Sequence, residues 1–271
     1  MTDQYAIIGN PVQQSKSPII HLAFAQVTHQ DLDYTKIEGH DFTADVDAFR
    51  ARGGRGMNIT APFKIDAFAY ATERSERAQL AGAANALKFD GDRVLAENFD
   101  GIGLVRDVTH NLRCALKGQR VLVLGAGGAT RGALLPFLAE QPAELVIANR
   151  SLGKAQELVA IGAAKGHVRA CTYADLEGQT FDVVFNATSA SLKTELPPVP
   201  ASVFTGCTLA YELAYGKGLT PFLRLAQNAG VKEVADGVGM LAEQAAEAFE
   251  WWRGVRPDTR AVIELLTVPL V

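Results

Sequence analysis

The sequence holds little of what marks a secreted, membrane-bound or disulfide-bonded protein. Its 271 residues include three scattered cysteines, Cys114, Cys171 and Cys207, with no Cys-x-x-Cys pair and no even-numbered framework. No apolar run approaches the roughly 18–20 residues that a membrane span requires. The N-terminal stretch carries Asp3 and lacks the basic segment followed by apolar residues that predicts a secretory signal. These absences predict a protein of the reducing cytoplasm without a membrane partner.

The sequence also lacks an excess of positive charge and a histidine spacing typical of metal ligands. Lys and Arg number 26 against 30 for Asp and Glu, a formal net charge of -4, whereas a nucleic-acid binder needs a concentrated positive face. We therefore expect no nucleic-acid partner. We expect no metal either, because the five histidines show no ligand spacing such as His-Glu-x-x-His. The sequence also lacks a Gly-x-Ser-x-Gly elbow and a Walker loop.

The first hundred residues alternate short strand patterns with helical ones, which predicts crossover connections and a mainly parallel sheet. The last two strands of this region, separated by Asp90-Gly91-Asp92, predict a hairpin with an Asp-Gly turn. The region is expected to end near residues 100–112. The expected strands are 5–9, 32–37, 56–60, 84–89 and 93–97, and the expected helices are 18–27, 43–51 and a segment after Pro62.

A second alternation begins at Gln119. Residues 121–124, Val-Leu-Val-Leu, form a fully apolar strand of the kind that parallel sheets bury. About six strands in all predict a doubly wound domain. The further strands are expected at 145–148, 168–171, 181–185, 207–213 and 232–234, and the helices at 130–140 and 152–164. Beyond them, Leu241, Ala245, Phe249 and Trp252 share one helix face, and we expect the C-terminal helices to pack back on the first domain.

A glycine-rich loop, Gly125-Ala126-Gly127-Gly128-Ala129-Thr130, stands directly between an apolar strand and a helix. Gly125 suits a tight turn, Gly127 lets the backbone approach a pyrophosphate, and the helix start offers free N–H groups with a partial positive charge. Thr130 stands where the dinucleotide-binding pattern has Gly or Ala. The loop predicts a dinucleotide site, and a structural glycine turn without a ligand is the alternative.

The residues after the next strand predict which dinucleotide binds. NAD-binding folds place an acid there to hold the ribose hydroxyls, whereas this chain has Asn149-Arg150-Ser151. Arg150 can bind a 2′-phosphate bidentately and stack on adenine, and Lys154 adds charge one helical turn further on. NADP is therefore preferred over NAD. A solvated surface arginine is the alternative interpretation of Arg150.

Three polar clusters mark the first domain. Ser15 and Ser17 stand at a helix start, where hydroxyl and N–H groups suit a bound carboxylate. The alternative is that one serine caps the helix and the other belongs to a turn, with no ligand. Lys64 stands in the first turn of a helix, where the dipole disfavours its charge and so favours proton transfer; an exposed lysine is the alternative. Asn85 and Asp100 stand at strand ends, where they are also common turn formers. Together these groups suit a small polyhydroxylated acid.

The chain resembles the shikimate dehydrogenase family over essentially its whole length. That family reduces 3-dehydroshikimate to shikimate reversibly with NADPH in aromatic amino-acid biosynthesis. The resemblance implies an α/β fold in which residues 1–102 and 238–271 form a substrate-binding domain and residues 103–237 a Rossmann-type NADP-binding domain. It is carried by Gly9-Asn10-Pro11-Val12 with the two serines, Asn58–Lys64, Asn85, Asp100-Gly101, the glycine loop, Asn149-Arg150, Asn186-Ala187-Thr188-Ser189, Tyr215, Asp236-Gly237-x-Gly239-Met240 and Gln244.

The resemblance also implies roles for single residues. Ser15 and Ser17 would hold the substrate carboxylate, and Lys64 and Asp100 would be the catalytic pair. The substrate hydroxyls and the reacting oxygen would be held by Thr60, Lys64, Asn85, Asp100 and Gln244, with Tyr215 beside them. The residues implied at the cofactor are Gly125, Ala126, Gly127, Gly128, Ala129, Asn149, Arg150, Ser151, Lys154, Thr188, Leu213 and Gly237.

Two positions depart from the family pattern. Leu22 stands where the family generally has Asn, and Phe99 stands where it has Thr before Asp100. A bulky ring in place of a hydroxyl beside the catalytic carboxylate leads us to expect slow turnover or an altered substrate preference. A Phe99 ring that packs into the core and leaves the site unaffected is the alternative.

Two other functions stay open. One is a quinate/shikimate dehydrogenase with relaxed cofactor or substrate use, although Asn149-Arg150 speaks against strict NAD dependence. The other is a slow or sensor-like homologue that binds NADPH or shikimate; intact Lys64 and Asp100 speak against it, whereas Phe99 keeps it open. A monomer and a homodimer are equally compatible with the sequence, and the expected partner is the small-molecule substrate.

Overall fold

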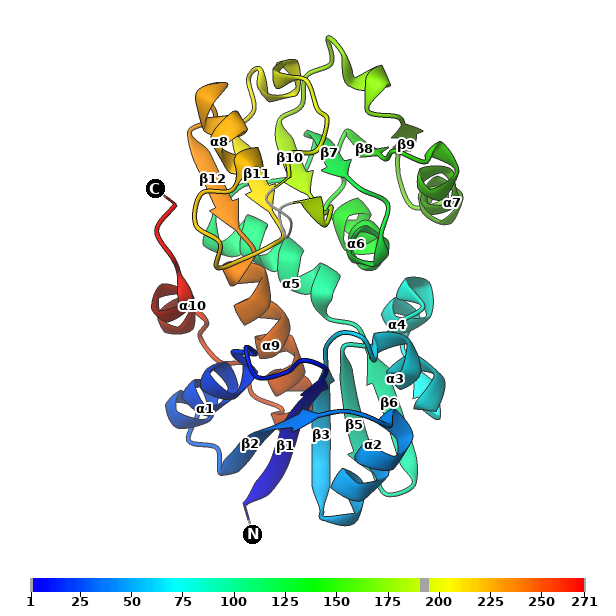
Figure 1. Cartoon of the computed structure of the whole chain (residues 1–271), viewed down its shortest axis with the longest axis vertical. Coiled ribbons are helices and arrows are strands. Elements are labelled where there is room, and N and C mark those ends of the chain that lie inside the picture. The colour runs from blue at the N-terminus through cyan, green and yellow to red at the C-terminus, as the bar shows by residue number, and fades with distance from the viewer. Residues whose placement is uncertain (1, 191–194, 271) are drawn as a thin grey trace. The chain divides into compact units, whose positions relative to one another are not determined.

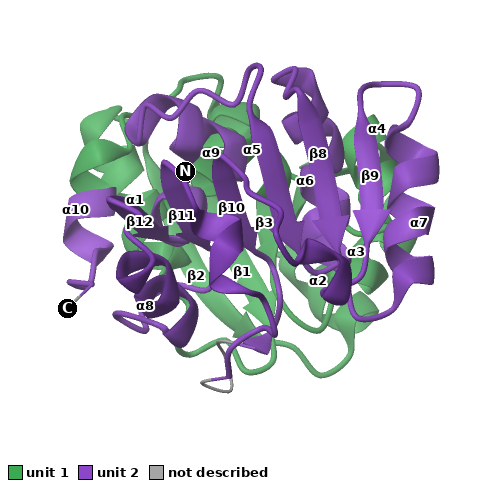
Figure 2. Cartoon of the chain, turned by 90° about the horizontal axis from the view of Figure 1, so that it is seen from above, with its two compact units in different colours: residues 1–103, 242–262 green, residues 104–241, 263–271 purple. Residues whose placement is uncertain are grey.

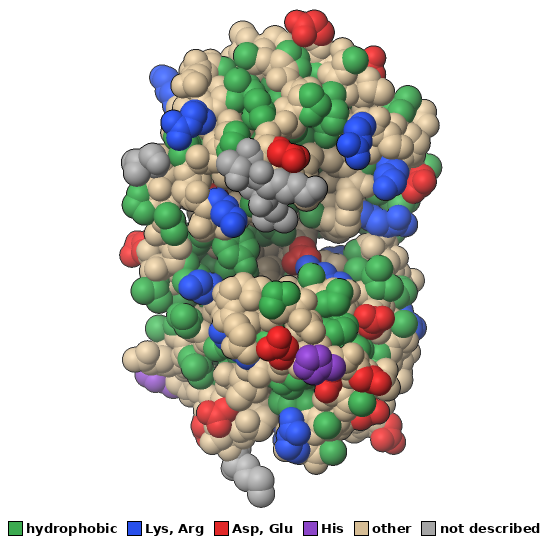
Figure 3. All heavy atoms as spheres, viewed as in Figure 1, with side chains coloured by type: hydrophobic (Ala, Val, Ile, Leu, Met, Phe, Trp, Pro, Cys, Tyr) green, Lys and Arg blue, Asp and Glu red, His purple; other side chains and the backbone are tan. Residues whose placement is uncertain are grey.

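The computed structural model describes residues 2–190 and 195–270, and the chain divides into two compact units (Figure 2). The first unit comprises residues 1–103 and 242–262, and the second comprises 104–241 and 263–271. Each unit contains one six-stranded sheet. Within the described residues, no helix has both the length and the apolar composition needed to cross a bilayer. On the face drawn in Figure 3, basic and acidic side chains are interspersed.

The sheet of the first unit has the strand order β2-β1-β3-β5-β6-β4 (Figure 1). Its strands are β1 Asp3–Gly9, β2 Leu32–Glu38, β3 Gly54–Ile59, β4 Glu73–Arg74, β5 Ala86–Asp90 and β6 Arg93–Glu97. β1 pairs in parallel with β2 and β3, as predicted. β5 runs antiparallel to both β3 and β6. The predicted turn at Gly91, with φ +58°, reverses the chain between β5 and β6. β4 pairs in parallel with β6, so β5 is the one reversed strand among the described strands of this sheet, and the expectation of a mainly parallel sheet is confirmed.

Helices cover both faces of this sheet, as the alternation of side chains along β1 requires. The helices are α1 Ser17–Val27, α2 Phe42–Ala51, α3 Lys64–Tyr70 and α4 Glu76–Ala81. Ala6 and Ile8 of β1 belong to a buried cluster with Phe42, Val46 and other side chains of α2 and α3. No element is predicted from the sequence in the stretch that contains β4 and α4.

The opposite face of the sheet is covered by α1 and α9 (Val238–Arg253), which lie side by side in Figure 1. The Trp252 ring stacks on Tyr5 with 4.8 Å between centroids, and its indole N–H donates to the Leu87 carbonyl at 3.0 Å. A β-carbon on Gly56 would lie 2.6 Å from the Trp252 nitrogen, so glycine makes room for this ring. The predicted return of the C-terminal chain is confirmed for α9, whereas α10 (Arg260–Leu266) continues into residues grouped with the second unit.

The second unit is reached through α5 (Asp100–Arg106) and a π-helical turn, and its sheet is entirely parallel with the order β12-β11-β10-β7-β8-β9. Alternate residues of β7 face two cores: Val121 and Val123 join one cluster, and Leu122 and Leu124 join the other. The elements are β7 Arg120–Leu124, α6 Gly128–Ala139, β8 Glu144–Ala148, α7 Leu152–Gly162, β9 Val168–Cys171, β10 Val183–Asn186, β11 Leu209–Glu212, α8 Pro221–Asn228 and β12 Glu233–Asp236.

The strand order of this sheet reverses between β7 and β10. In doubly wound sheets the ligand binds at that point, outside the carboxyl ends of the strands. The six strands agree with the prediction, although β10 begins at Val183, two residues later than expected. The loops that follow β7 and β10 are therefore where a ligand of this unit is expected.

A buried histidine packs between α1 and the first sheet. The His21 ring lies flat on Tyr34, with 4.4 Å between centroids and 5° between planes, and it also contacts Trp252 at 5.3 Å. It is 1% exposed, and among the described residues neither ring nitrogen has a hydrogen-bond partner. Burial lowers the pKa of His21 from 6.5 to about 3, because charging the ring would require desolvating a cation.

This burial predicts a stability that depends on pH. Between pH 6.5 and about pH 3 the unfolded chain binds a proton at His21 that the folded chain does not. The free energy of unfolding should therefore fall as pH falls through that window, by up to about 1.4 kcal/mol per pH unit from this residue. His21→Phe keeps an aromatic ring and removes the titration, so urea unfolding between pH 7.5 and pH 5 should lose less stability than the wild type.

The matched control is His40→Phe at an exposed histidine, which should keep the wild-type pH dependence. An unchanged slope in His21→Phe would show that the buried ring is not the group responsible.

Candidate active site and cofactor pocket

The first site is an ion pair between the starts of two helices. Lys64 is the first residue of α3 and Asp100 the first residue of α5, and the Lys64 Nζ lies 2.6 Å from the Asp100 Oδ2. The side chains are 36% and 20% exposed, so the pair is accessible to a ligand. The sequence prediction that Lys64 stands in the first turn of a helix is confirmed.

A buried amide orients the carboxylate of this pair. Asn85, which precedes β5, donates through Nδ2 to the Asp100 Oδ1 at 2.8 Å and to the Gln244 Oε1 at 3.2 Å. Its own Oδ1 accepts the Phe99 backbone N–H at 2.9 Å. Each Asp100 oxygen therefore has one donor, Lys64 for one and Asn85 for the other. The geometry therefore orients the Lys64 Nζ through a carboxylate that is itself held in place.

A glycine brings the Gln244 side chain to this group. A β-carbon on Gly103 of α5 would lie 2.6 Å from the Gln244 backbone nitrogen of α9, so only glycine allows the two helices to approach this closely. The structure thus brings together four of the predicted substrate residues, which are Lys64, Asn85, Asp100 and Gln244.

The two predicted serines form a second polar group, at the N-terminus of α1. The Ser15 Oγ lies 3.2 Å from the Ser17 Oγ and accepts the Ser17 backbone N–H at 3.3 Å. Hydroxyls and N–H groups at the start of an 11-residue helix favour a negatively charged ligand. Thr60 lies just beyond β3, where a β-carbon on Gly9 would fall 2.3 Å from its methyl group. Gly9 therefore permits the close approach of β1 and the Thr60 side chain.

Phe99 is packed away from solvent. Its side chain is 3% exposed, its ring meets the Trp251 ring edge-on at 5.7 Å between centroids, and the Arg77 guanidinium lies 5.7 Å from its centroid. These contacts favour the alternative in which the ring joins the core, and they remove the argument for slow turnover from a ring in the site. Leu22, the other departure from the family pattern, is exposed on α1.

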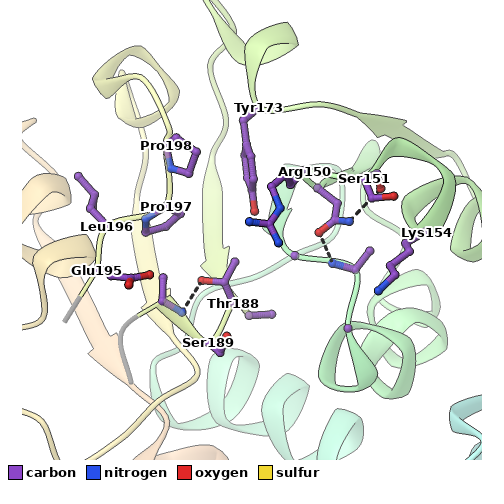
Figure 4. A pocket seen from close by; sticks show the side chains of 16 residues that line it. Arg150, Ser151, Lys154, Tyr173, Thr188, Ser189, Glu195, Leu196, Pro197 and Pro198 are labelled. Carbon is purple, nitrogen blue, oxygen red and sulfur yellow. Dashed lines mark hydrogen bonds between the residues drawn. The ribbon is translucent and has the colours of Figure 1, made fainter. Parts of the chain in front are cut away.

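The second site is a pocket of about 580 Å³ in the second unit, at the carboxyl ends of β7, β8 and β10 (Figure 4). Eight predicted cofactor residues line it, namely Gly125, Ala126, Gly127, Asn149, Arg150, Ser151, Lys154 and Thr188. Eight further lining residues were not predicted, namely Tyr173, Ala187, Ser189, Ala190, Glu195, Leu196, Pro197 and Pro198. Most of these follow β10, and the rule that places ligands at the strand-order reversal was the signal that could have found them.

The glycine loop has the backbone that a phosphate site needs. Gly125 adopts φ +101°, and its carbonyl accepts the buried Thr130 hydroxyl at 2.7 Å, which explains a threonine in place of Gly or Ala. A β-carbon on Gly127 would meet nothing within 4 Å, so the backbone there stays open to a ligand. α6 begins at Gly128 and directs its free N–H groups at the same place.

The basic end of the pocket lies after β8. The Asn149 side chain accepts the Ala126 backbone N–H at 3.3 Å and donates to the Ser151 carbonyl at 2.9 Å, which fixes the loop that carries Arg150. In Figure 4 the Arg150 side chain lies beside the Tyr173 ring. Burial raises the pKa of the Tyr173 phenol, and the positive charge of Arg150 opposes the rise. This end therefore suits a phosphate next to a flat, stackable group.

The other predicted residues lie elsewhere in the second unit. Gly128 and Ala129 belong to the start of α6. Leu213 and Gly237 follow β11 and β12, where a β-carbon on Gly237 would lie 2.2 Å from the Leu213 carbonyl oxygen. Tyr215 is 43% exposed and belongs to the second unit, whereas the other predicted substrate residues belong to the first.

Comparisons with known proteins point to one family along most of the chain. Residues 7–87 match a family model described as the shikimate dehydrogenase substrate binding domain, residues 107–194 one described as shikimate / quinate 5-dehydrogenase, and residues 237–267 one described as the shikimate 5'-dehydrogenase C-terminal domain. The chain is 53% identical to proteins named shikimate dehydrogenase (NADP(+)) from Nitrosospira multiformis and Chromobacterium violaceum, over 98% of both chains in each case.

Solved structures show the same similarity. A crystal structure of an Ael1 enzyme from Pseudomonas putida has a TM-score of 0.98 and 62% identity, with 100% of both chains covered. A shikimate 5-dehydrogenase from Thermus thermophilus in complex with NADP(H) and shikimate has a TM-score of 0.86 and 28% identity, over 97% of this chain and 98% of the other.

The glycine loop yields a prediction about stability. Gly125→Ala should lower the free energy of unfolding by about 1–3 kcal/mol, because φ +101° strains any other residue and the new β-carbon would crowd the Ala187 carbonyl at 3.2 Å. Gly128→Ala is the matched control, since its β-carbon would meet nothing within 4 Å at a helical position. Urea unfolding of the two variants should separate them, and equal stabilities would contradict the strained turn.

Proposed function

The chain belongs to the shikimate dehydrogenase family, and from this we infer that it catalyses the reversible NADPH-dependent reduction of 3-dehydroshikimate to shikimate in aromatic amino-acid biosynthesis. It is an NADP-dependent oxidoreductase that acts on a ring CH–OH group of a small molecule. The observation that carries this function is the pair of Lys64 and Asp100, whose Nζ and Oδ2 atoms lie 2.6 Å apart and whose carboxylate is oriented by Asn85. The chain that holds this pair is 53% identical to a protein named shikimate dehydrogenase (NADP(+)).

The pair has the chemistry that the reaction requires. The chemistry that NADPH would supply when bound is a hydride for the ring carbonyl carbon. Lys64 donates the proton that the developing alkoxide takes up, and it recovers a proton from solvent, to which its side chain is open. Asp100 accepts a hydrogen bond from the Lys64 Nζ and directs it, while Asn85 keeps the carboxylate from turning. In the reverse direction Lys64 would first release its proton to solvent, and its free amine would then accept the hydroxyl proton of the substrate.

The remaining predicted residues bind the substrate in this proposal. Ser15 and Ser17 would hold the carboxylate with hydroxyl groups and the N-terminus of α1. Thr60, Asn85 and Gln244 would hold the hydroxyls, and the family resemblance assigns Tyr215 to the substrate as well. The first unit is then the substrate-binding domain.

The pocket of the second unit would hold NADP. The glycine loop with Gly128 and Ala129 receives the pyrophosphate, and Arg150, Ser151 and Lys154 receive the 2′-phosphate. The part of the cofactor that lies near β7 and β10, where the strand order reverses, is assigned to Thr188, Leu213 and Gly237. The residues present fit this cofactor, because a cation rather than an acid follows β8.

Location and assembly follow from the same reasoning. We place the protein in the cytoplasm, where reducing conditions keep Cys114, Cys171 and Cys207 free. The Lys64, Asp100, Asn85 and Gln244 cluster is complete within one chain, so the proposed chemistry requires no residue from a second subunit. The enzyme is therefore proposed to work equally as a monomer or within a homodimer.

Steady-state kinetics test the function directly. Shikimate and quinate are each oxidised with NADP⁺ and with NAD⁺, and absorbance of the reduced nicotinamide reports all four rates. Shikimate with NADP⁺ should give the highest kcat/KM. A higher value with quinate or with NAD⁺ would favour the relaxed enzyme instead, and binding of NADPH without any turnover would favour a sensor.

Removing the proton donor should abolish most of the rate. Lys64→Ala should lower kcat for shikimate oxidation by about two to four powers of ten, the usual contribution of a general acid–base group. Lys36→Ala, at an exposed lysine of β2, is the control and should retain wild-type turnover. A folded Lys64→Ala enzyme with near-normal kcat would refute the assignment.

Arg150 should decide the cofactor preference. Arg150→Ala should raise KM for NADP⁺ by about 10- to 100-fold, because a charge-assisted hydrogen bond to phosphate contributes about 1.5–3 kcal/mol. NAD⁺ lacks the 2′-phosphate and serves as the internal control, so its KM should change by less than about threefold. Equal increases in both KM values would mean that Arg150 does not recognise the 2′-phosphate.

A further inference from the structure

A buried glutamate joins three segments of the second unit. Glu212 is the last residue of β11, and it is fully buried. Its Oε2 accepts the Asn186 Nδ2 at 2.9 Å and the Thr220 hydroxyl at 3.3 Å. Its Oε1 accepts the Ala214 backbone N–H at 3.4 Å. These donors come from the end of β10, the start of α8 and the loop after β11, so one carboxyl group holds all three segments together.

The side-chain amide of Asn186 has a single orientation between its neighbours. Asn186 is the last residue of β10, is fully buried, and stands opposite Glu212 in the parallel register. Its Oδ1 accepts the Thr188 backbone N–H at 3.1 Å and the Thr188 hydroxyl at 2.8 Å. Turning the amide over would set its NH₂ group against a backbone N–H, which can only donate, and its oxygen against a carboxylate, which can only accept. Glu212 therefore keeps the amide oxygen directed at Thr188.

Thr188 is the point at which these hydrogen bonds reach the cofactor pocket (Figure 4). Its hydroxyl donates to Asn186 and accepts the Ala190 backbone N–H at 3.3 Å, which fixes the turn after β10. A β-carbon on Gly125 would lie 3.2 Å from the Thr188 methyl group and 3.2 Å from the Ala187 carbonyl oxygen. The turn therefore packs closely against the glycine loop, and its position shapes the pocket that both of them line.

We propose that Glu212 is a positioning residue for the cofactor, which holds Thr188 and residues 187–190 in place through the Asn186 amide. Without an acceptor, the buried NH₂ group of Asn186 is unpaired and the amide gains other conformers, so only a fraction of the enzyme has the turn that NADP binds. The inference rests on the proposed function, which assigns NADP to this pocket. It gives Glu212 a role in cofactor affinity and none in proton or hydride transfer.

The test measures NADP⁺ binding to the complete enzyme by calorimetry. Glu212→Met keeps a long unbranched side chain and removes both acceptor oxygens, so the Kd of NADP⁺ should rise about three- to tenfold, the usual contribution of one hydrogen bond. The conservative variant Glu212→Gln keeps one oxygen that can face the Asn186 Nδ2, and it should bind within about twofold of the wild type. In steady-state kinetics, Glu212→Met should raise KM for NADP⁺ more than it lowers kcat, with KM for shikimate changed by less than about twofold.

Thr220→Val is the matched control for a loss of stability. It removes the other donor to the Glu212 Oε2 and the side-chain cap of α8, and it leaves the bond between Glu212 and Asn186 in place. It should lower the urea midpoint of unfolding and leave the Kd of NADP⁺ within about twofold of the wild type. If Glu212→Met alone does not fold, Thr220→Val is added to it, because this removes the second donor left unpaired. The Kd of that double variant should exceed that of Thr220→Val by the same three- to tenfold.

Three results would overturn the proposal: a Glu212→Met enzyme that binds NADP⁺ as the wild type does, equal losses of affinity in Glu212→Met and in Glu212→Gln or Thr220→Val, or a loss confined to kcat. Oxidation of shikimate by the wild type tests the proposed function separately. A wild type that binds NADP⁺, with no effect of Glu212→Met, rejects only the role of Glu212. A wild type that does not bind NADP⁺ rejects the proposed cofactor and this role with it.

Discussion

The hydrogen bonds of the buried Asn85 amide are the constraint on which the first unit depends. The side chain joins Asp100 of α5 to Gln244 of α9, and the backbone N–H of Phe99 occupies its oxygen. The backbone of the same residue bonds to Ile59 and Glu97 at the ends of β3 and β6. One residue thus fixes the ends of two strands and the carboxylate beside Lys64. A shift of any of these elements would leave buried polar atoms unpaired, which ties the geometry of the active site to the stability of the sheet.

The fold could be predicted where local patterns determine it. The apolar run of β7 and its successors predicted a parallel doubly wound sheet, because strands that are covered on both faces read as nearly continuous apolar runs. The antiparallel β5 could be recognised as part of a hairpin, but not as the neighbour of β3, since that pairing is non-local. The helices α4 and α8 are 6 and 8 residues long, too short for a periodic pattern to show. Local caps mark where they begin, since the Ser75 hydroxyl accepts the Ala78 N–H in α4 and the Thr220 hydroxyl accepts the Leu223 N–H in α8.

The site was predictable to a similar degree. Family resemblance identified Lys64, Asp100, Asn85 and Gln244, and the structure places their side chains in one hydrogen-bonded group. Sequence position could not show that the Phe99 ring packs on Trp251, because the two residues are far apart in the chain. Nor could it show the pocket wall contributed by Tyr173, which follows a different strand from the glycine loop. Residues whose role depends on distant partners are visible only after folding.

Both proposed ligands are anions, whereas the protein carries a net charge of -4, so attraction has to come from local groups. The two units solve this differently. In the proposed function the second unit would use Arg150 and Lys154 beside a helix N-terminus, which suits a phosphate with up to two charges. The first unit would use neutral hydroxyls at the N-terminus of α1, while Lys64 pairs with Asp100. Because a lysine engaged by the substrate carboxylate could not also protonate the carbonyl, neutral recognition of the carboxylate would leave Lys64 available for the chemistry.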